Sequence, residues 1–220
     1  MRSILSVWVI PFQAYENAES RLYLHRIYQN VNKMHKLILA SKSPRRSWLL
    51  QQAGFTFELR VADVEEDFPA DLHVNEVAGY LAQKKAQAIP VYPNEVLLTA
   101  DSVVILDGVI FGKPTDYDDA ARILRALSGR MHQVITGVCL RTTESEQLLS
   151  DESKVYFEPL SDAEIDYYIR TCAPYDKAGA YAIQEWIGLC KITRLEGSYA
   201  NVMGLPVHRV YEALKSYSLQ

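Results

Sequence analysis

The feature that most constrains this chain is a long apolar run, residues 95–108, with the sequence EVLLTADSVVILDG. A run this rich in Val, Leu and Ile predicts a strand at the centre of a sheet, where both faces of the strand are buried. The Asp-Gly pair at its end, followed by VIFG, predicts a hairpin. The chain therefore folds around a sheet, and this run is its central strand.

Asp101 lies in the middle of the apolar run. A carboxylate inside a buried strand is costly unless something compensates its charge. The residues alone leave two interpretations open. In the first, Asp101 is paired with a Lys or Arg, or is bonded to backbone at a bulge in the strand. In the second, Asp101 is a metal ligand or a general base at a site that opens on the sheet.

Strand and helix patterns mix along the rest of the chain without strict alternation. This mixture predicts an α/β fold with a mixed sheet and flanking helices, rather than a doubly wound parallel sheet. We expect further strands at 37–40, 55–63, 132–142, 153–160 and 186–197, and helices at 44–53, 75–89, 113–129, 161–171 and 206–217.

Composition excludes some classes of function. The 220 residues carry a net charge of −4, which argues against a protein that grips nucleic acid through a basic face. No apolar run reaches the roughly 18 residues that predict a membrane span. The three cysteines are far apart and show no metal-binding spacing, which favours reduced thiols and a cytoplasmic protein.

Residues 1–33 do not share the pattern of the rest. Met34 stands directly before the first confident strand, and a start there leaves one domain, residues 34–220. We expect residues 1–33 to be a poorly ordered extension or a start-site artefact. A signal peptide is the weaker interpretation, because Pro11 interrupts a short apolar stretch.

Two arginines, Arg45 and Arg46, follow Pro44 in SKSPRRS at the start of a predicted helix. Pro suits the first helical position, and Ser43 suits the N-cap. Cations are mildly unfavourable there, because the helix N-terminus already carries partial positive charge. The pattern indicates that an anion such as a triphosphate binds at this helix start. Neither a P-loop nor a Rossmann fingerprint is present in the sequence.

Other charged residues fit the same chemistry. Lys113 lies on a stiff loop before Pro114, Lys84 and Lys85 end a helix pattern, and residues 65–67 form an acidic cluster. Each has a plain alternative as a solvated surface charge. Taken together with Asp101, they provide carboxylates for a divalent cation and cations for phosphate oxygens.

Eight segments follow one another as in one known family. The chain from residue 37 to the final helix resembles the Maf family of nucleoside triphosphate pyrophosphatases. The matching segments are LILASKSPRRSWLLQQAGF, VEED, LAQKKA, LLTADSVVILDGVIFGKP, DDAARILRALSGRMHQVITGV, LSDAEIDYYI, PYDKAGAYAIQE and GSYANVMGLPVHRV.

The resemblance implies a fold and a reaction. The fold is an elongated, curved mixed sheet with two lobes around a cleft. The reaction is hydrolysis of a nucleoside triphosphate to the monophosphate and pyrophosphate, with Mg²⁺ or Mn²⁺ as cofactor. Asp101 matches the catalytic proton acceptor, Glu66 helps to hold the metal with Asp101, and Lys85 and Lys113 match two essential lysines. The family also suggests a homodimer.

The resemblance assigns five further residues to substrate binding. Arg45, Ser102 and Gln184 match positions tied to base selection, while Ser41 and Arg46 fall in the phosphate-binding turn. An amide such as Gln184 can meet both the acceptor O4 and the donor N3–H of a pyrimidine.

The loop sequence DKAGAYAIQ resembles the branch of the family that acts on dTTP and UTP, with modified pyrimidine triphosphates as further candidates. Ser102 departs from this branch, which usually has Thr at that position. Two alternatives stay open: a pyrophosphatase for 7-methyl-GTP or ITP, and a non-enzymatic regulator of septum formation in cell division.

Overall fold

The structure, a computed structural model, describes residues 34–219. The expectation for residues 1–33 lies outside the described residues. Among those described, every helix is too short or too polar to cross a membrane.

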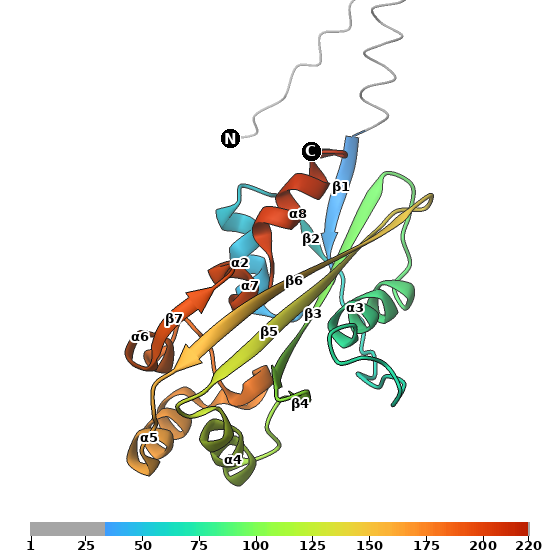
Figure 1. The fold of residues 1–220 in the computed structure, drawn as a ribbon. Helices are drawn as coiled ribbons and strands as arrows, with labels where there is room; N and C mark the ends of the chain where they lie inside the picture. The colour runs from blue at the N-terminus through green and yellow to red at the C-terminus, as the bar shows by residue number, and fades with distance from the viewer. Residues whose placement is uncertain (1–33, 220) are drawn as a thin grey trace, which may run out of the picture. The chain divides into compact units, whose positions relative to one another are not determined.

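The described residues form one mixed sheet of eight strands (Figure 1). The strand order is β2-β1-β3-β5-β6-β7, with β4 paired to β3 and β8 paired to β1. β1 runs parallel to β2 and β3, while the β3–β4, β3–β5, β5–β6 and β6–β7 pairs are antiparallel. The open mixed sheet expected from the sequence is confirmed. The strands are β1 (Met34–Leu39), β2 (Glu58–Leu59), β3 (Glu95–Leu106), β4 (Val109–Phe111), β5 (Met131–Arg141), β6 (Glu146–Phe157), β7 (Ile192–Glu196) and β8 (Ser218–Leu219).

Helices flank the sheet in three groups: α3 alone, α2 with α7 and α8, and α4 with α5 and α6 (Figure 1). Two short 3-10 turns, η2 and η3, lie between α5 and α6. The helices and turns are α2 (Pro44–Gln52), α3 (Val77–Gln87), α4 (Tyr117–Leu127), α5 (Asp162–Cys172), η2 (Pro174–Asp176), η3 (Ala178–Ala180), α6 (Trp186–Lys191), α7 (Tyr199–Met203) and α8 (Val207–Leu214).

Alternation along the strands explains why helices cover both faces. Successive side chains of a strand point to opposite faces. On β1, Ile38 packs in the cluster that contains the α3 residues Ala82 and Ala86, whereas Leu37 and Leu39 pack in the cluster with α2 and α8. The continuous apolar pattern of β3 follows from this double burial, so the prediction of a central strand is confirmed.

Several local signals have the predicted outcome. The side chain of Asp116 caps α4 by accepting the backbone N–H of Asp119. Ser161 and Glu164 form a capping box at the start of α5, where the sequence predicted a helix from residue 161. The hairpin after β3 turns at Asp107 and Gly108, both with positive φ, as a tight two-residue hairpin requires.

Residues 186–191 correct one prediction, because they form helix α6 rather than a strand. The apolar and β-branched residues there are typical of a strand. The chain turns tightly just before this helix, and Gly188 lies against the backbone carbonyl of Ile183 so closely that no Cβ would fit. Only residues 192–196 of the predicted segment form the strand β7.

The strand predicted at 55–63 is also much shorter than expected. Only Glu58 and Leu59 pair with β1. The N–H of Arg60 still bonds to the carbonyl of Leu39, at 3.2 Å, and the chain then leaves the sheet as a long loop. Alternation in the sequence could not reveal how few residues would find a partner strand.

Candidate active site

A gap in the sheet beside β3 creates the candidate site. On its β1 side, β3 pairs with β1 as far as Leu98 and with β4 only from Val104 onward. The residues between them, 99–103, pair only with β5. Gaps where a neighbouring strand ends are favoured places for ligands in open α/β sheets.

Two side chains provide hydrogen-bond partners for backbone groups at the open edge of β3 in this gap. The carbonyl of Ala100 accepts a hydrogen bond from Arg46 Nη1 at 2.9 Å. The N–H of Ser102 donates to Asp101 Oδ1 at 2.8 Å. Because the edge is open, residues of β3 that point to opposite faces, such as Asp101 and Ser102, reach the same space.

A cavity of about 460 Å³ occupies this gap. Its size is in the usual range for sites that bind a small molecule. The walls include the acidic loop, defined as residues 60–76, and the Gln184 loop, defined as residues 173–185. The nine residues to which the family resemblance assigns a catalytic or binding role all line this cavity, whereas Lys84, Glu65 and Asp67 do not. The nine are Ser41, Arg45, Arg46, Glu66, Lys85, Asp101, Ser102, Lys113 and Gln184.

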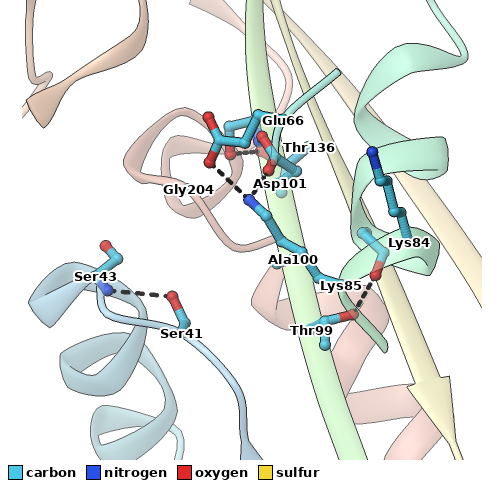
Figure 2. Close-up of polar contacts among 12 residues, drawn as sticks. Ser41, Ser43, Glu66, Lys84, Lys85, Thr99, Ala100, Asp101, Thr136 and Gly204 are labelled. Atoms are coloured by element: carbon cyan, nitrogen blue, oxygen red, sulfur yellow. Dashed lines mark hydrogen bonds and ion pairs between the residues drawn. The ribbon is translucent and has the colours of Figure 1, made fainter. Parts of the chain in front are cut away.

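Alternating charges run along one wall of the cavity. The ammonium of Lys85 donates to Asp101 Oδ2 and to Glu66 Oε1, the latter at 2.9 Å, and Figure 2 shows both carboxylates converging on it. Lys113 Nζ donates to both oxygens of Glu66, at 3.0 and 2.9 Å. Four residues from four distant parts of the sequence therefore form one chain of contacts.

Asp101 is the buried member of this chain, with 11% of its side chain exposed. Its partner, Lys85, supplies the compensating charge that the sequence required. The proposed bulge is wrong, because β3 and β5 pair without a register shift from Leu97 to Ile105. A paired carboxylate that lines a cavity is compatible with both interpretations that the sequence left open.

Gly137 places the helix that carries Lys85. This glycine lies opposite Asp101 on β5. A Cβ at position 137 would overlap the backbone of Ala78 and Gly79, in the first turn of α3. The missing side chain lets α3 lie directly on the sheet, so that Lys85 reaches Asp101.

Glu66 is more ionised than an ordinary glutamate. Burial alone would raise the pKa of Glu66, but hydrogen bonds from Lys113 and then Lys85 outweigh burial and lower the pKa to about 2. A carboxylate so firmly charged is suited to bind cations rather than to exchange protons near neutral pH.

Four carboxylates line the cavity, and two of them, Glu66 and Asp101, meet at the Lys85 ammonium, where the sequence predicts a divalent cation. Among the residues described, no group of three or more His, Cys, Asp or Glu side chains converges on one point. Mg²⁺ needs no such cage when substrate phosphates complete its coordination, since one or two carboxylates are usual at phosphate sites. Two carboxylates that share the Lys85 ammonium fit that requirement.

Arg46 and Arg45 differ in what they contact. Arg46 donates to the carbonyl of Gly204 at 2.7 Å and to the hydroxyls of Ser102 and Ser41 at 3.1 and 3.4 Å, in addition to Ala100. Burial lowers the pKa of Arg46, and Asp101 partly offsets that effect. Arg46 thus holds protein groups together, whereas Arg45 makes one long contact, 3.4 Å to Asp176, and lines the cavity.

The start of α2 is open to a ligand, because Ser43 occupies the N-cap position without a side-chain hydrogen bond to the helix. The hydroxyl of Ser41 instead accepts the N–H of Ser43, at 3.2 Å. This hydroxyl also accepts from Arg46, as described above. Ser41 therefore fixes the turn that the sequence assigned to phosphate binding.

Hydrogen-bond direction is fixed at Ser102. The hydroxyl of Thr136 donates to the carbonyl of Asn201 at 3.1 Å, so it must accept from Ser102 Oγ, 2.9 Å away. Ser102 Oγ in turn accepts from Arg46 Nη2. With its proton used, Ser102 can offer a ligand only a lone pair.

Gln184 is the one predicted residue with unused hydrogen-bonding capacity at a buried atom. Its Oε1 is buried and has no hydrogen-bond partner within residues 34–219. An unsatisfied buried acceptor costs about 1–3 kcal/mol. An N–H donor from a ligand in the cavity would remove that cost.

The sequence did not reveal Lys177, which also lines the cavity. This lysine is almost buried, and its Nζ lies 2.6 Å from Asp176 Oδ1 and 3.5 Å from Glu185 Oε1. The only signal was a cation in a loop rich in Gly and Ala. Thr136 and Asn201 were equally hidden, because neither interrupts an apolar pattern.

Comparison with known proteins gives the family. The family model described as Maf-like protein matches residues 36–217, nearly all of the described part. The chain belongs to the Maf family. Three curated relatives carry the name dTTP/UTP pyrophosphatase. The relative from Porphyromonas gingivalis is 50% identical over 84% of this chain and 96% of its own length.

The other two relatives come from different bacteria. The protein from Phocaeicola vulgatus is 50% identical over 85% of this chain and 98% of its own length. The protein from Flavobacterium johnsoniae is 46% identical over 83% and 95%. Matching solved structures are more remote: a HAM1 protein from Coxiella burnetii is 16% identical, with a TM-score of 0.39 over 56% of this chain and 73% of that chain. Membership of the Maf family rests on the family model and the curated relatives.

Proposed function

We propose that this Maf protein hydrolyses dTTP and UTP to the monophosphate and pyrophosphate. One observation carries the proposal: a single cavity joins a chain of alternating charges, Asp101 to Lys113, with a buried amide oxygen at Gln184 that lacks a partner. The charges suit a triphosphate and the amide suits a base. Relatives named for this activity are up to 50% identical.

The chemical step is an in-line attack of water on the α-phosphorus. The new bond forms between the water oxygen and this phosphorus, while the bond to the bridging oxygen breaks and its electron pair leaves with pyrophosphate. Asp101 accepts the proton of the attacking water. Its fixed position, held by Lys85 and by the N–H of Ser102, supplies the orientation that such a base requires.

Cations on both sides of Glu66 bind the phosphates. Lys85 and Lys113 neutralise negative charge on the reacting and leaving groups. Arg45, whose one hydrogen bond among residues 34–219 is the 3.4 Å contact with Asp176, can bind phosphate or base from the start of α2. Arg46 supports this site by holding Ala100, Ser102 and the Gly204 turn in place.

Glu66 and Asp101 would hold the divalent cation, Mg²⁺ or Mn²⁺. When bound, the metal polarises phosphate oxygens as a Lewis acid. The ionised state of Glu66, ensured by its two lysines, keeps that position ready for a cation over a wide pH range.

Base selection follows from the buried acceptor. Uracil and thymine carry a donor, N3–H, beside the acceptor O4, and Gln184 offers an acceptor Oε1 beside a donor amide nitrogen. Cytosine presents the reverse order, a donor at N4 and an acceptor at N3, so it would pair with Gln184 only if the amide group turned over. Sites built around such hydrogen bonds reject analogues that leave buried groups unsatisfied.

The test is pyrophosphate release from dTTP, UTP, CTP, GTP, ITP and 7-methyl-GTP with Mg²⁺ or Mn²⁺. We expect turnover of dTTP and UTP and a loss of about 1,000-fold in Asp101→Asn, within the range for removal of a general base. Activity mainly on ITP or 7-methyl-GTP would overturn the base assignment. No activity with any triphosphate in folded, metal-loaded protein would overturn the enzymatic function.

We also propose a cytoplasmic homodimer. The three cysteines, Cys139, Cys172 and Cys190, are all free thiols, which supports a reducing compartment. The dimer rests on the family resemblance alone. Light scattering on purified protein checks it, and a monomer mass at micromolar concentration would contradict it.

A further inference from the structure

Gln184 is placed in the cavity by its backbone rather than by its own side-chain oxygen. Within residues 34–219, Oε1 of Gln184 has no hydrogen-bond partner. What fixes the amide is therefore the short segment Ala182–Glu185, a turn closed by a hydrogen bond from the N–H of Glu185 to the carbonyl of Ala182, at 3.1 Å. Whatever holds this turn also sets the position of the amide that meets the base.

One hydroxyl contacts both ends of the turn. Tyr168, on α5, is fully buried. Its oxygen accepts the backbone N–H of Ala182 at 3.0 Å and donates its proton to the carboxylate of Glu185. Burial first, and then the hydrogen bond to Glu185, raise the pKa of Tyr168 well above its ordinary value, so the hydroxyl keeps its proton. A single oxygen atom thus clamps both ends of the segment that carries Gln184.

The clamp continues toward a second cavity residue. The other oxygen of Glu185 lies 3.5 Å from Lys177, which contacts Asp176 at 2.6 Å. Asp176 accepts from Arg45 at 3.4 Å. A continuous series of polar contacts therefore connects the Tyr168 hydroxyl with Arg45 at the start of α2.

We propose that Tyr168 is a positioning residue for base selection, because its buried hydroxyl fixes the turn that presents Gln184. This inference rests on the proposed function, since base selection is the property that it explains. The hydrogen bonds of Tyr168 within the described residues go only to Ala182 and Glu185, and reach none of the charged residues around Asp101. Loss of the hydroxyl therefore loosens base recognition and leaves the chemical step intact.

The experiment compares two Tyr→Phe variants that each remove one oxygen. Tyr168→Phe removes the clamp. Tyr117→Phe is the matched control, because the hydroxyl of Tyr117 also donates to a carboxylate of α5, Asp166 at 2.6 Å. Within the described residues, this hydroxyl makes no hydrogen bond to the Gln184 loop. For wild type and both variants, kcat and KM are measured with UTP and CTP, and dissociation constants are measured with UMP and CMP by calorimetry.

For Tyr168→Phe we expect kcat/KM for UTP to fall about tenfold, mainly through KM, with little change for CTP. The ratio of CMP to UMP dissociation constants falls by a similar factor. In Tyr117→Phe, the ratio of kcat/KM for UTP to that for CTP and the ratio of CMP to UMP dissociation constants both stay at their wild-type values. Glu185→Gln keeps an acceptor for the Tyr168 hydroxyl, so we expect it to lose less discrimination between UTP and CTP than Glu185→Ala. These two variants also carry the test if Tyr168→Phe does not fold.

Unchanged ratios in Tyr168→Phe, equal changes in both Tyr→Phe variants, or a loss confined to kcat would each overturn the inference. Failure of the proposed function looks different. In that case the wild type hydrolyses neither dTTP nor UTP. The ratio of CMP to UMP dissociation constants, compared between wild type and Tyr168→Phe, still decides whether Tyr168 positions the base site.

Discussion

The acidic loop and the Gln184 loop line the same cavity but are held in opposite ways. Most of the acidic loop is exposed, and 42% of the Glu66 side chain is accessible. Ion pairs hold this loop: Glu66 with Lys85 and Lys113, and Asp67 with Lys84. In the Gln184 loop, by contrast, residues 179–183 are all buried, and even the lysine of the loop is only 9% exposed.

This difference separates two tasks of the site. Exposed ion pairs contribute about 0–1 kcal/mol each and are easily exchanged for others. The lysines around Glu66 can therefore pass from carboxylate to phosphate when a substrate binds. Buried hydrogen bonds and close packing fix the Gln184 loop before any ligand arrives, which is what discrimination between bases requires.

The largest expected effect concerns the acidic loop. Glu66→Gln keeps the shape of the side chain but removes the charge that contacts Lys85 and Lys113. We expect pyrophosphate release to fall about 100-fold, while the free energy of unfolding changes by less than about 1 kcal/mol, because the ion pairs lost are exposed. Glu65→Gln, one residue away, is the control and should retain activity. Steady-state kinetics and urea unfolding measure both.

If Glu66→Gln lost several kcal/mol of stability, the acidic loop would be a structural element and the contrast between the loops would be wrong. If Glu65→Gln lost as much activity, the net charge of the loop rather than the position of Glu66 would matter.

A smaller effect is expected in the Gln184 loop. Gly188→Ala introduces a Cβ where the carbonyl of Ile183 lies, so the turn before Gln184 must move. We expect a loss of about 1–3 kcal/mol in the free energy of unfolding, as for other overpacked sites, and weaker discrimination of UTP from CTP. Gly79→Ala is the control, since it also lies in a helix but has open space around the new Cβ. It should stabilise the protein slightly. Equal stability of the two variants would show that the turn is pliable.

The smallest effect is a dependence of stability on pH. The pKa of Glu66 is about 2 in the folded protein, below its ordinary value of 4.5. The stability that Glu66 contributes is therefore complete above the unfolded pKa and is lost as the pH falls toward the folded pKa. The urea midpoints of wild type and Glu66→Gln should differ by a constant amount above about pH 5 and converge below it. A difference that persists undiminished to about pH 2 would mean that charge on Glu66 does not stabilise the fold.

The same contrast explains what the sequence could reveal. Asp101 was interpretable because a carboxylate in an apolar strand has few explanations, and Lys85 is one of them. Family resemblance then collected nine residues that do line one cavity. A charged residue can be recognised in a sequence when it interrupts a hydrophobic pattern, as Asp101 does.

The buried supports of the site gave no such signal. Tyr168 reads as an ordinary core residue of an amphipathic helix, and its partners Ala182 and Glu185 are distant in the sequence. Arg46 was expected to bind phosphate, and its bonds to Ala100 and Gly204, which lie 54 and 158 residues away, had no signal in the sequence. Helix α6 was missed because its apolar and β-branched residues are typical of a strand, and the close approach of Gly188 to Ile183 is not visible in that pattern.

The contact between Gly137 and α3 has a consequence for anyone who engineers this enzyme. The reach of Lys85 toward Asp101 depends on the absence of a side chain at Gly137, which lies opposite Asp101 on β5. A mutant library confined to the residues that line the cavity would leave this spacing intact, because Gly137 is not one of them, whereas a substitution at Gly137 would change it. Gly137 therefore belongs among the positions to hold constant when new substrates are sought.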